Sequence, residues 1–469
     1  MDIADIRRAT KKLTGPSQPY EMHEVAVDGV VLPVFRAAPP NLRGLFESSL
    51  AFAGRDFYVF QGERFTFQQT WDIAASVANA LRRDGVRPGD RIAIASRNYP
   101  EWIFAFMGVT SIGAIAVCMN AWWTTEELAY GLEDSGARLV FADAERTRPA
   151  RATARHARHH RGRRSQSLTE IIPAGARLGC IHRGVFASNA NGGCRARRQR
   201  DHSLHIRVDG ASQGRAGNAS QHHPRRNGLG MWCRDRGRAC PETVDPNPEF
   251  LPAMMLAVPL FHVAGLNVQF MSSFRTGRKL VGMYKWDPEE ALRLIESERV
   301  TGFNGVPTMS WELVQSPNFD KYDLRSLKSA GGGGSAMAPE HARQISKKLT
   351  PGGGAAGTGY GMTETNGLGT SIAGADLAGR PRSAGRPIPP VVTIRVVDVD
   401  GNELPRGKTG EIWFKGAMNF RGYWNNPSAT LATLTDGWVH SGDIGHMDDQ
   451  DFVFITDRAK DMIIRGGEN

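Results

Sequence analysis

The chain has 469 residues, 41% of them hydrophobic and 23% charged, which is the composition of an ordinary folded protein with room for two or more subdomains. Its formal net charge of +10 is unevenly placed. Residues 146–247 hold 21 Arg, no Lys and six acidic residues, a surplus of 15 positive charges that leaves −5 for the other 367 residues. A basic surface extending over the whole chain is therefore excluded.

Neither the cysteines nor the start of the chain points to secretion. Five cysteines without regular spacing indicate a reducing, cytoplasmic setting, and M-D-I-A-D-I-R-R lacks the apolar run of a signal peptide. Residues 102–119 are apolar, but they contain Gly108 and Gly113 and lie between alternating helix and strand patterns. We therefore expect a buried helix and strand there, with no membrane span and at most a peripheral membrane contact.

The N-terminal third predicts alternating strands and helices. The first 45 residues carry weak signals, and we expect them on the outside. Residues 57–67 (F-Y-V-F-Q-G-E-R-F-T-F) predict a hairpin that turns at residues 61–62. The alternation predicts a mostly parallel sheet covered by helices. Its expected elements are a helix over 68–84, a strand over 91–96, a helix from Pro100, a strand over 114–119, a helix capped by Thr124 and Glu127 and ending near Gly136, and a strand over 137–141.

From Arg146 to about residue 247 neither a helical nor a strand period persists. Order returns at 254–267 (M-M-L-A-V-P-L-F-H-V-A-G-L-N), where an apolar strand ends at Pro259 and a helix follows. A lone histidine among apolar residues, His262, is by itself typical of a packed core. Next we expect a strand over 279–283, a helix over 287–299 capped by Asp287, a strand and turn over 301–309, and a helix containing Trp311.

Two glycine-rich stretches follow. Residues 327–339 read L-K-S-A-G-G-G-G-S-A-M-A-P, and residues 357–365 read G-T-G-Y-G-M-T-E-T. Glycine lets backbone approach a ligand closely, and Tyr360 offers a flat face for a base. The hydroxyl of Thr363 suits a phosphate oxygen, and the carboxylate of Glu364 suits Mg²⁺. Alone, residues 357–365 are equally consistent with a glycine-rich turn between core elements, and residues 327–339 are more consistent with a flexible glycine turn before the helix that starts near Pro339.

Short β-strands are expected from Val391 onward, with a turn at 400–402 and a strand over 410–416. Four further motifs follow in this part of the chain. They are F-R-G-Y-W-N-N-P at 420–427, D-G-W-V-H-S-G-D at 436–443, D-R-A-K-D at 457–461 and G-G-E-N at 466–469.

Taken together, these motifs resemble those of the AMP-forming adenylating enzymes, which include acyl-CoA synthetases, firefly luciferase and non-ribosomal peptide adenylation domains. The resemblance covers residues 45–145 and 250–469. The stretches A-S-R-N-Y-P-E-W and P-L-F-H-V-A-G are most similar to fatty acyl-CoA synthetases. The family resemblance implies an α/β fold: a large N-terminal domain of parallel sheets covered by helices, with a small β subdomain. We expect the family's small C-terminal domain, with its catalytic lysine, to be missing.

The resemblance divides the chain into five expected parts. The expected parts are a first α/β subdomain (1–145), a poorly ordered segment (146–247), a second α/β subdomain with the acyl and adenine pockets (248–390), a small β subdomain (391–456) and a hinge with the stub of the missing domain (457–469).

The resemblance also implies an activity. A carboxylic acid attacks the α-phosphate of ATP, with Mg²⁺ bridging phosphates, and coenzyme A then displaces AMP from the acyl adenylate. The expected ligands are ATP or AMP, Mg²⁺, coenzyme A and a carboxylic acid, preferably a fatty acid. A ligase for a short or aromatic acid is the alternative.

The family resemblance implies site residues at the positions of this chain that match the family's motifs. The implied catalytic residues are Thr363 and Glu364, with Glu364 also the metal ligand, and Asp457 is the hinge. The implied nucleotide-binding residues are Gly333, Gly334, Ser335, Gly359, Tyr360, Gly361, Met362, Thr363, Asp443 and Arg458, and the acyl pocket is lined by Phe261, His262, Gly305 and Val306. Asp443 matches the carboxylate that accepts both ribose hydroxyls. Thr358 stands where the family often has Asn or Gln, so adenine selectivity is expected to rest more on backbone contacts.

The family's phosphate-binding loop is absent from the sequence as written. Residues 204–214, back-translated with chosen synonymous codons and read one base later, spell Y-T-S-G-S-T-G-R-P-K-G, a full phosphate loop. We therefore hypothesise that 146–247 is read out of frame. Such a chain would bind AMP weakly and have little activity, or be a non-catalytic remnant.

Two other interpretations of the basic segment are weaker. A nucleic-acid-binding insert would contain aromatics for stacking on bases, and the segment has only Phe186 and Trp232, so we expect no nucleic-acid partner. A zinc site would need paired ligand spacing, which is lacking among Cys180, His182, Cys194, Cys233 and Cys240.

Overall fold

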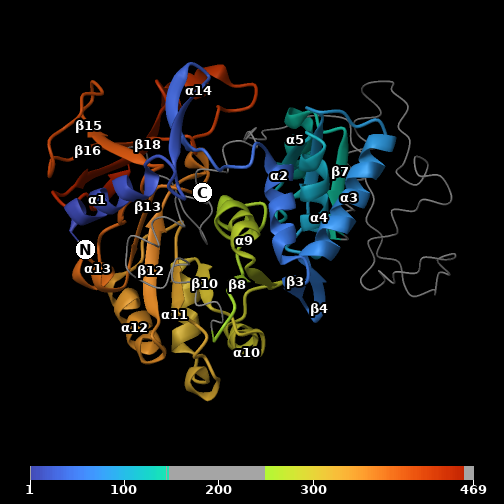
Figure 1. Ribbon diagram of the computed structural model, residues 1–469, viewed down its shortest axis with the longest axis horizontal. Coiled ribbons are helices and arrows are strands. Elements are labelled where there is room, and N and C mark those ends of the chain that lie inside the picture. Colours follow the sequence, from blue (N-terminus) through green and yellow to red (C-terminus); the bar gives the residue numbers. More distant parts are fainter. Residues whose placement is uncertain (1, 144, 147–248, 459–469) are drawn as a thin grey trace. The chain divides into compact units, whose positions relative to one another are not determined.

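The computed structural model describes residues 2–143, 145–146 and 249–458. They form two compact units, one of residues 2–69 and 249–458 and the other of 70–143 and 145–146 (Figure 1). The predicted poorly ordered segment lies outside the described residues except for Arg146, as do residues 459–469 of the predicted hinge and stub. The five predicted domain boundaries stay predictions.

The first unit is built on a nine-stranded sheet. Its central strands pair in parallel, whereas β12–β13, β13–β14 and β3–β4 pair antiparallel, so this sheet is mostly parallel, as the family resemblance implied. In sheet order the strands are β14 (Arg386–Pro387), β13 (Thr370–Ala373), β12 (Ala355–Tyr360), β11 (Ser329–Gly332), β10 (Gly302–Gly305), β8 (Ala253–Leu256), β9 (Lys279–Gly282), β3 (Asp56–Phe60) and β4 (Glu63–Thr66).

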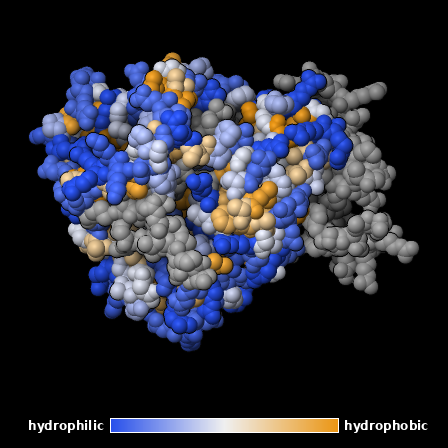
Figure 2. All heavy atoms as spheres, in the orientation of Figure 1, coloured by the Kyte–Doolittle hydropathy of each residue, from blue (hydrophilic) through white to orange (hydrophobic). Residues whose placement is uncertain are grey.

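Helices cover this sheet. α11 and α12 pack against β10, β11 and β12 (Figure 1), and their outward surface is mostly hydrophilic (Figure 2). Ile295, Leu313 and Ile345 are fully buried in the core between helices and sheet. The helices of this part are η4 (Ala264–Phe270), α9 (Met271–Thr276), α10 (Pro288–Glu298), α11 (Pro307–Gln315), η5 (Phe319–Lys321), α12 (Pro339–Leu349), η6 (Thr350–Gly352), η7 (Thr363–Thr365) and α13 (Gly374–Gly379).

Local signals set the element ends as predicted. The β3–β4 hairpin turns at Gln61 and Gly62, which both have positive φ. The carboxylate of Asp287 accepts hydrogen bonds of 2.9 Å from the backbone N–H groups of Glu289 and Glu290, and this caps α10.

A small five-stranded sheet follows, as predicted. Its core contains Ile412, Phe414 and Val439, and Phe35 from the N-terminal region packs into it. Phe35 is 1% exposed, so the prediction that the first 45 residues lie outside is wrong for this residue. The remaining elements of the unit are β15 (Thr393–Val397), β16 (Gly410–Lys415), β17 (Leu434–Thr435), β18 (Trp438–Met447), β19 (Val453–Arg458), α14 (Pro427–Thr433), α1 (Ile3–Thr14), β1 (Met22–Val27), β2 (Val30–Phe35), α2 (Leu42–Glu47) and η1 (Ser48–Phe52).

In its described part, the second unit is a three-stranded parallel sheet with helices packed beside it. α4 is buried at Pro100 and from Trp102 through Val109, and a Cβ on Gly108 would lie 2.7 Å from Val77 of the neighbouring α3. The apolar stretch is thus a buried helix followed by a strand, and none of the helices in the described ranges is long and apolar enough to cross a membrane. The elements are α3 (Phe67–Arg83), which begins at the unit boundary, β5 (Arg91–Ala95), α4 (Pro100–Ser111), β6 (Ile115–Cys118), α5 (Thr125–Ser135, with the predicted Thr124–Glu127 capping box) and β7 (Leu139–Ala142).

Candidate nucleotide and acyl site

The site residues of the first unit gather where the parallel strands end. Gly331 pairs with Gly357 and Gly332 with Thr358, so β11 and β12 run side by side in register. Ligands of open α/β sheets bind at the carboxyl ends of such strands. The loops that leave β10, β11 and β12 therefore form one edge on which the predicted residues lie.

Close strand packing explains part of the glycine content. A Cβ on Gly331 would lie 1.8 Å from the backbone oxygen of Gly357, so these two strands cannot accept a side chain there. Residues 357–360 belong to strand β12, which corrects the interpretation of this stretch as a turn. After β11, Gly333 lies beside Gly359, because its Cβ would be 3.1 Å from the Gly359 oxygen. Gly334 and Ser335 follow and are exposed.

Tyr360, Asp443 and Arg458 meet in one polar cluster. Asp443 is 4% exposed in β18 and accepts a 2.5 Å hydrogen bond from the Tyr360 hydroxyl through Oδ2. Its Oδ1 lies 2.8 Å from Nε of Arg458, which β19 positions beside Asp443. Three predicted nucleotide residues, from positions up to 98 apart in the chain, are therefore in direct contact.

The surroundings of Tyr360 keep its hydroxyl protonated. Burial raises the pKa of Tyr360 well above its ordinary value, and the adjacent carboxylate of Asp443 raises it further. Tyr360 is therefore a neutral hydrogen-bond donor, and its ring packs 5.4 Å from that of Phe414. A carboxylate has about four lone-pair sites, so Asp443 keeps acceptor capacity for ribose hydroxyls beside its two protein partners.

Thr363 and Glu364 lie in η7, which begins three residues after Tyr360, the last residue of β12. Thr363 is exposed, whereas Glu364 is only 7% exposed. The Tyr423 hydroxyl donates a 2.6 Å bond to Oε1 of Glu364, and the backbone N–H of Phe420 donates a 2.7 Å bond to its carbonyl oxygen. The 420–427 motif therefore holds Glu364 in place. Gly361 and Met362, between Tyr360 and this turn, are half-buried.

The donor set fits an Mg²⁺ ion that takes few ligands from the protein. Within the described ranges, no cluster of three or more His, Cys, Asp or Glu residues could hold a metal ion without help. Mg²⁺ usually takes one or two carboxylates and completes its shell with substrate phosphates and water, and Glu364 supplies such a carboxylate. The zinc ligands considered above all lie outside the described residues.

Of the four predicted acyl-pocket residues, Phe261 and His262 lie in the segment between β8 and η4, and Gly305 and Val306 lie at the end of β10. Phe261 and His262 precede η4, whose Gly265 is needed because its Cβ would lie 2.1 Å from the Pro259 oxygen. Gly305 ends β10 and is buried, and Val306 is half-buried before α11.

His262 is held as a neutral imidazole. Burial lowers its pKa below the ordinary histidine value. Its Nδ1 accepts a 3.2 Å bond from the backbone N–H of Ala264, which assigns the proton to Nε2. His262 therefore presents an N–H donor and no charge.

Buried amides join the acyl and nucleotide elements. Nδ2 of Asn267 donates to Oδ1 of Asn366 at 3.1 Å, and Nδ2 of Asn366 donates to the Met418 oxygen at 2.7 Å. Nε2 of Gln269 donates to the Asn304 oxygen at 2.5 Å. None of these side chains, nor that of Tyr423, was among the predicted site residues. The signal was present, because polar side chains within the apolar run L-N-V-Q-F need internal partners.

Thr358 and Asp457 each form a hydrogen bond with nearby backbone. The Thr358 hydroxyl donates a 2.8 Å bond to the Gly332 oxygen, so it is engaged by the neighbouring strand and not directed to a base. Asp457 is exposed in β19, and its carboxylate accepts a 2.8 Å bond from the backbone N–H of Arg458. Its hinge role stays a prediction.

The sequence and fold of this chain are similar to those of known proteins. A family model described as AMP-binding enzyme matches residues 45–181 and 230–424. A feruloyl-CoA synthase of an Amycolatopsis species is 30% identical over 414 residues, 87% of this chain and 76% of that protein. A long-chain-fatty-acid–CoA ligase of Bacillus subtilis is 28% identical over 462 residues, 91% of this chain and 78% of that protein. The N-terminal domain of FACL13 from Mycobacterium tuberculosis superposes with a TM-score of 0.69 at 25% identity, covering 89% of this chain and all of that one.

Proposed function

Because the chain belongs to the family of AMP-binding enzymes, we propose that its site activates a carboxylic acid with ATP and transfers the acyl group to coenzyme A. The chain is an acid–CoA ligase of the AMP-forming class by descent, and its α/β fold is that of the N-terminal domain of these enzymes. The observation that carries the proposal is the contact of Tyr360 and Arg458 with the buried carboxylate of Asp443 at the carboxyl edge of the sheet.

In this proposal each residue has one role. A carboxylate oxygen of the acid attacks the α-phosphorus of ATP, and the bond to pyrophosphate breaks. The thiol of coenzyme A then attacks the acyl carbon, and AMP leaves. Asp443 accepts the ribose hydroxyls, the Tyr360 ring stacks on the base, and the Thr363 hydroxyl donates to a phosphate oxygen. Glu364 would hold Mg²⁺, which neutralises phosphate charge when bound.

The fatty acids are the first substrate class we propose. The P-L-F-H-V-A-G stretch around Phe261 and His262 carries this assignment, and the similarity to the Bacillus subtilis ligase supports it. An aromatic acid is the second candidate, because the feruloyl-CoA synthase is similar over nearly the same share of the chain. Competition between decanoate and ferulate for acyl-adenylate formation, measured on the chain in which residues 204–214 are replaced by Y-T-S-G-S-T-G-R-P-K-G, separates the two. Preference for ferulate would contradict the fatty-acid assignment.

We also propose that the chain as written has strongly reduced activity. The phosphate loop appears only when residues 204–214 are read one base later, and the family match is interrupted from 182 to 229, around this stretch. The match also includes 146–181 and 230–247, which our hypothesis placed inside the shifted stretch. Losing one transition-state contact of this kind costs about 10²- to 10³-fold in rate.

The cytoplasmic location stays a prediction.

Two experiments test this assignment. Calorimetric titration should detect AMP binding that Asp443→Asn weakens by about tenfold or more, and absence of AMP binding to the wild type would contradict the nucleotide site. ATP–pyrophosphate exchange should be near background in this chain and should rise when residues 204–214 are replaced by Y-T-S-G-S-T-G-R-P-K-G. Exchange as fast as in an intact relative, or an uninterrupted frame on resequencing the gene, would refute the frame-shift hypothesis.

A further inference from the structure

β18 has a bulge at the carboxylate that we assign to the ribose. In the pairing of β18 with β16, Glu411 lies opposite Ile444 and Trp413 lies opposite His440. One residue of β16 therefore faces three of β18, residues 441–443, and the last of these is the assigned acceptor. Two extra residues keep the side-chain alternation of the strand, so this acceptor stays on the buried face.

The bulge takes backbone N–H groups out of the ladder between the strands, and side chains supply their acceptors. The N–H of Gly442, whose φ of +71° is left-handed, donates a 2.8 Å bond to Oε1 of Glu411. The N–H of Asp443 donates a 3.0 Å bond to Oγ of Ser441. Glu411 thus connects the bulge to β16 at the point where the ladder between the two strands is interrupted.

Contacts on the same face of the sheet hold the Glu411 carboxylate. Its Oε2 accepts a 2.8 Å bond from Nε1 of Trp413. The Trp413 ring stacks on that of His440, with centroids 3.7 Å apart and planes at 12°, and the guanidinium of Arg395 lies 4.6 Å from the Trp413 ring centroid. Both oxygens of Glu411 are therefore engaged, one by the bulge and one by an indole that packs against side chains of both neighbouring strands.

The orientation of Asp443 matters because little of its carboxylate is free. Its Oδ2 accepts the bond from Tyr360, and its Oδ1 pairs with Arg458. A carboxylate has about four lone-pair sites, so about two are left for ribose hydroxyls, and their directions follow the backbone at residues 442–443. Rotation of this backbone would turn the remaining lone pairs away from a ribose without removing the charge.

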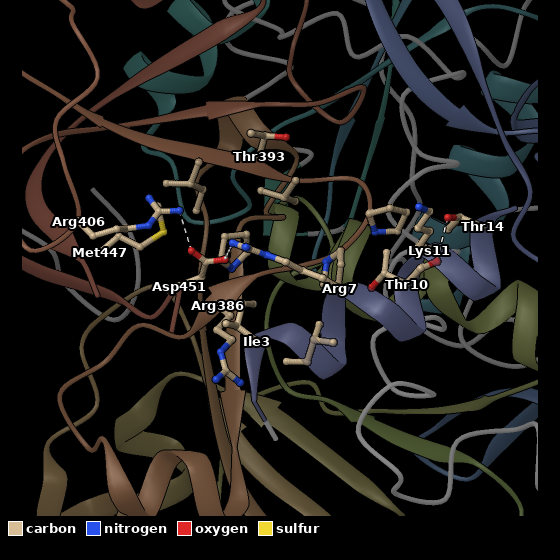
Figure 3. A pocket seen from close by; sticks show the side chains of 16 residues that line it. Ile3, Arg7, Thr10, Lys11, Thr14, Arg386, Thr393, Arg406, Met447 and Asp451 are labelled. Atoms are coloured by element: carbon tan, nitrogen blue, oxygen red, sulfur yellow. Dashed lines mark hydrogen bonds and ion pairs between the residues drawn. The ribbon is translucent and has the colours of Figure 1, made fainter. Parts of the chain in front are cut away.

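Separate contacts hold the far end of β18. Asp451, in the turn between β18 and β19, pairs with Arg7 and with Arg406, at N–O distances of 2.6 and 2.7 Å (Figure 3). These ion pairs stabilise the hairpin of β18 and β19 at its turn, whereas Glu411 acts at the bulge. A variant of Arg406 therefore reports what a loss of hairpin stability alone does to nucleotide binding.

We propose that Glu411 is a positioning residue for the ribose-binding carboxylate. By accepting the Gly442 N–H, it fixes the bulge in the conformation that directs the free lone pairs of Asp443 at the ribose hydroxyls. This inference rests on the proposed nucleotide site and extends it, because Glu411 acts through Asp443 and not on the nucleotide. Loss of Glu411 should therefore weaken recognition of the two hydroxyls and spare the rest of the nucleotide.

The test is calorimetric titration of the full chain with AMP and with 2′,3′-dideoxy-AMP, because the ratio of the two affinities measures recognition of the ribose hydroxyls. We expect Glu411→Ala to lower AMP affinity by about tenfold and to leave dideoxy-AMP affinity unchanged. Arg406→Ala should lower stability in urea and keep the wild-type ratio. Glu411→Gln combined with Trp413→Phe should also keep the ratio. Glutamine retains an oxygen for the Gly442 N–H, and phenylalanine removes the indole N–H that the glutamine amide group cannot accept.

A double-mutant cycle in urea measures the same coupling without nucleotide. If Glu411 orients Asp443, the bond from Tyr360 to Asp443 is weaker in Glu411→Ala, so Tyr360→Phe should change the unfolding constant less in that variant than in the wild type. Additive effects of the two substitutions, or an unchanged ratio of AMP to dideoxy-AMP affinity in Glu411→Ala, would each overturn the proposal. A wild-type chain that binds no AMP would instead refute the nucleotide site, and the cycle would still decide whether Glu411 positions Asp443.

Discussion

The bond from the Tyr360 hydroxyl to Asp443 contributes to stability but need not contribute to nucleotide affinity, and Tyr360→Phe separates the two. The O–O distance is 2.5 Å and Asp443 is 4% exposed, so water cannot readily replace the lost donor. A hydrogen bond to a charged group contributes about 1.5–3 kcal/mol. We expect the free energy of unfolding to fall by that amount, a change of about ten- to a hundredfold in the unfolding constant.

The same substitution should leave AMP affinity unchanged or higher. Phenylalanine keeps the ring that stacks on the base, and the lost hydroxyl frees Oδ2 of Asp443 as an acceptor for a ribose hydroxyl. Asp443→Asn, in contrast, removes the charge of the acceptor and should weaken AMP binding by about tenfold or more.

Urea unfolding followed by tryptophan fluorescence measures the first effect, and calorimetric titration with AMP the second. Tyr130→Phe, an exposed position in the other unit, is the matched control and should shift stability by no more than about 0.5 kcal/mol. If Tyr360→Phe unfolds at the wild-type urea concentration, or weakens AMP as much as Asp443→Asn does, the reasoning about this cluster is refuted.

Three further outcomes follow from single contacts. Tyr423→Phe removes the hydroxyl donor to the buried Glu364 carboxylate and should lower the free energy of unfolding by about 1–3 kcal/mol in urea melts. Gly331→Ala places a Cβ 1.8 Å from a backbone oxygen of β12, and by pushing the strands apart should cost about 1–3 kcal/mol or more and abolish AMP binding. His262→Gln should flatten the pH dependence of stability. Burial lowers the pKa of His262, so the unfolded chain binds a proton that the folded chain does not, and stability falls as pH drops through about 6.5.

Each of these predictions has a control variant or a result that would contradict it. For Tyr423→Phe, unchanged melting would mean that other partners already satisfy Glu364. Gly379→Ala is the control for Gly331→Ala, because a Cβ there meets nothing within 4 Å, and equal effects would argue against strand crowding. For His262→Gln, stability curves parallel to the wild type between pH 5.5 and 7.5 would show that this imidazole does not carry the pH dependence.

Much of the fold could be predicted from local sequence. The Thr124–Glu127 capping box, the Asp287 cap and the turn at Gln61 all depend on contacts within three or four residues, and the structure has each of them. The positions of residues that pack against distant parts of the chain were harder to predict from the sequence. Phe35 was expected outside with its weakly patterned neighbours, yet it is buried in the core of the small sheet.

The candidate site shows the same division. Motif resemblance predicted site roles for Tyr360, Asp443 and Glu364, and these roles stay predictions. Tertiary structure alone decided that Tyr360 contacts Asp443 from 83 positions away and that Tyr423 holds Glu364. The register of β11 with β12 and of β18 with β19 sets these contacts. Such pairings depend on which strands become neighbours and which side chains are buried between them, and a local pattern of residues contains neither piece of information.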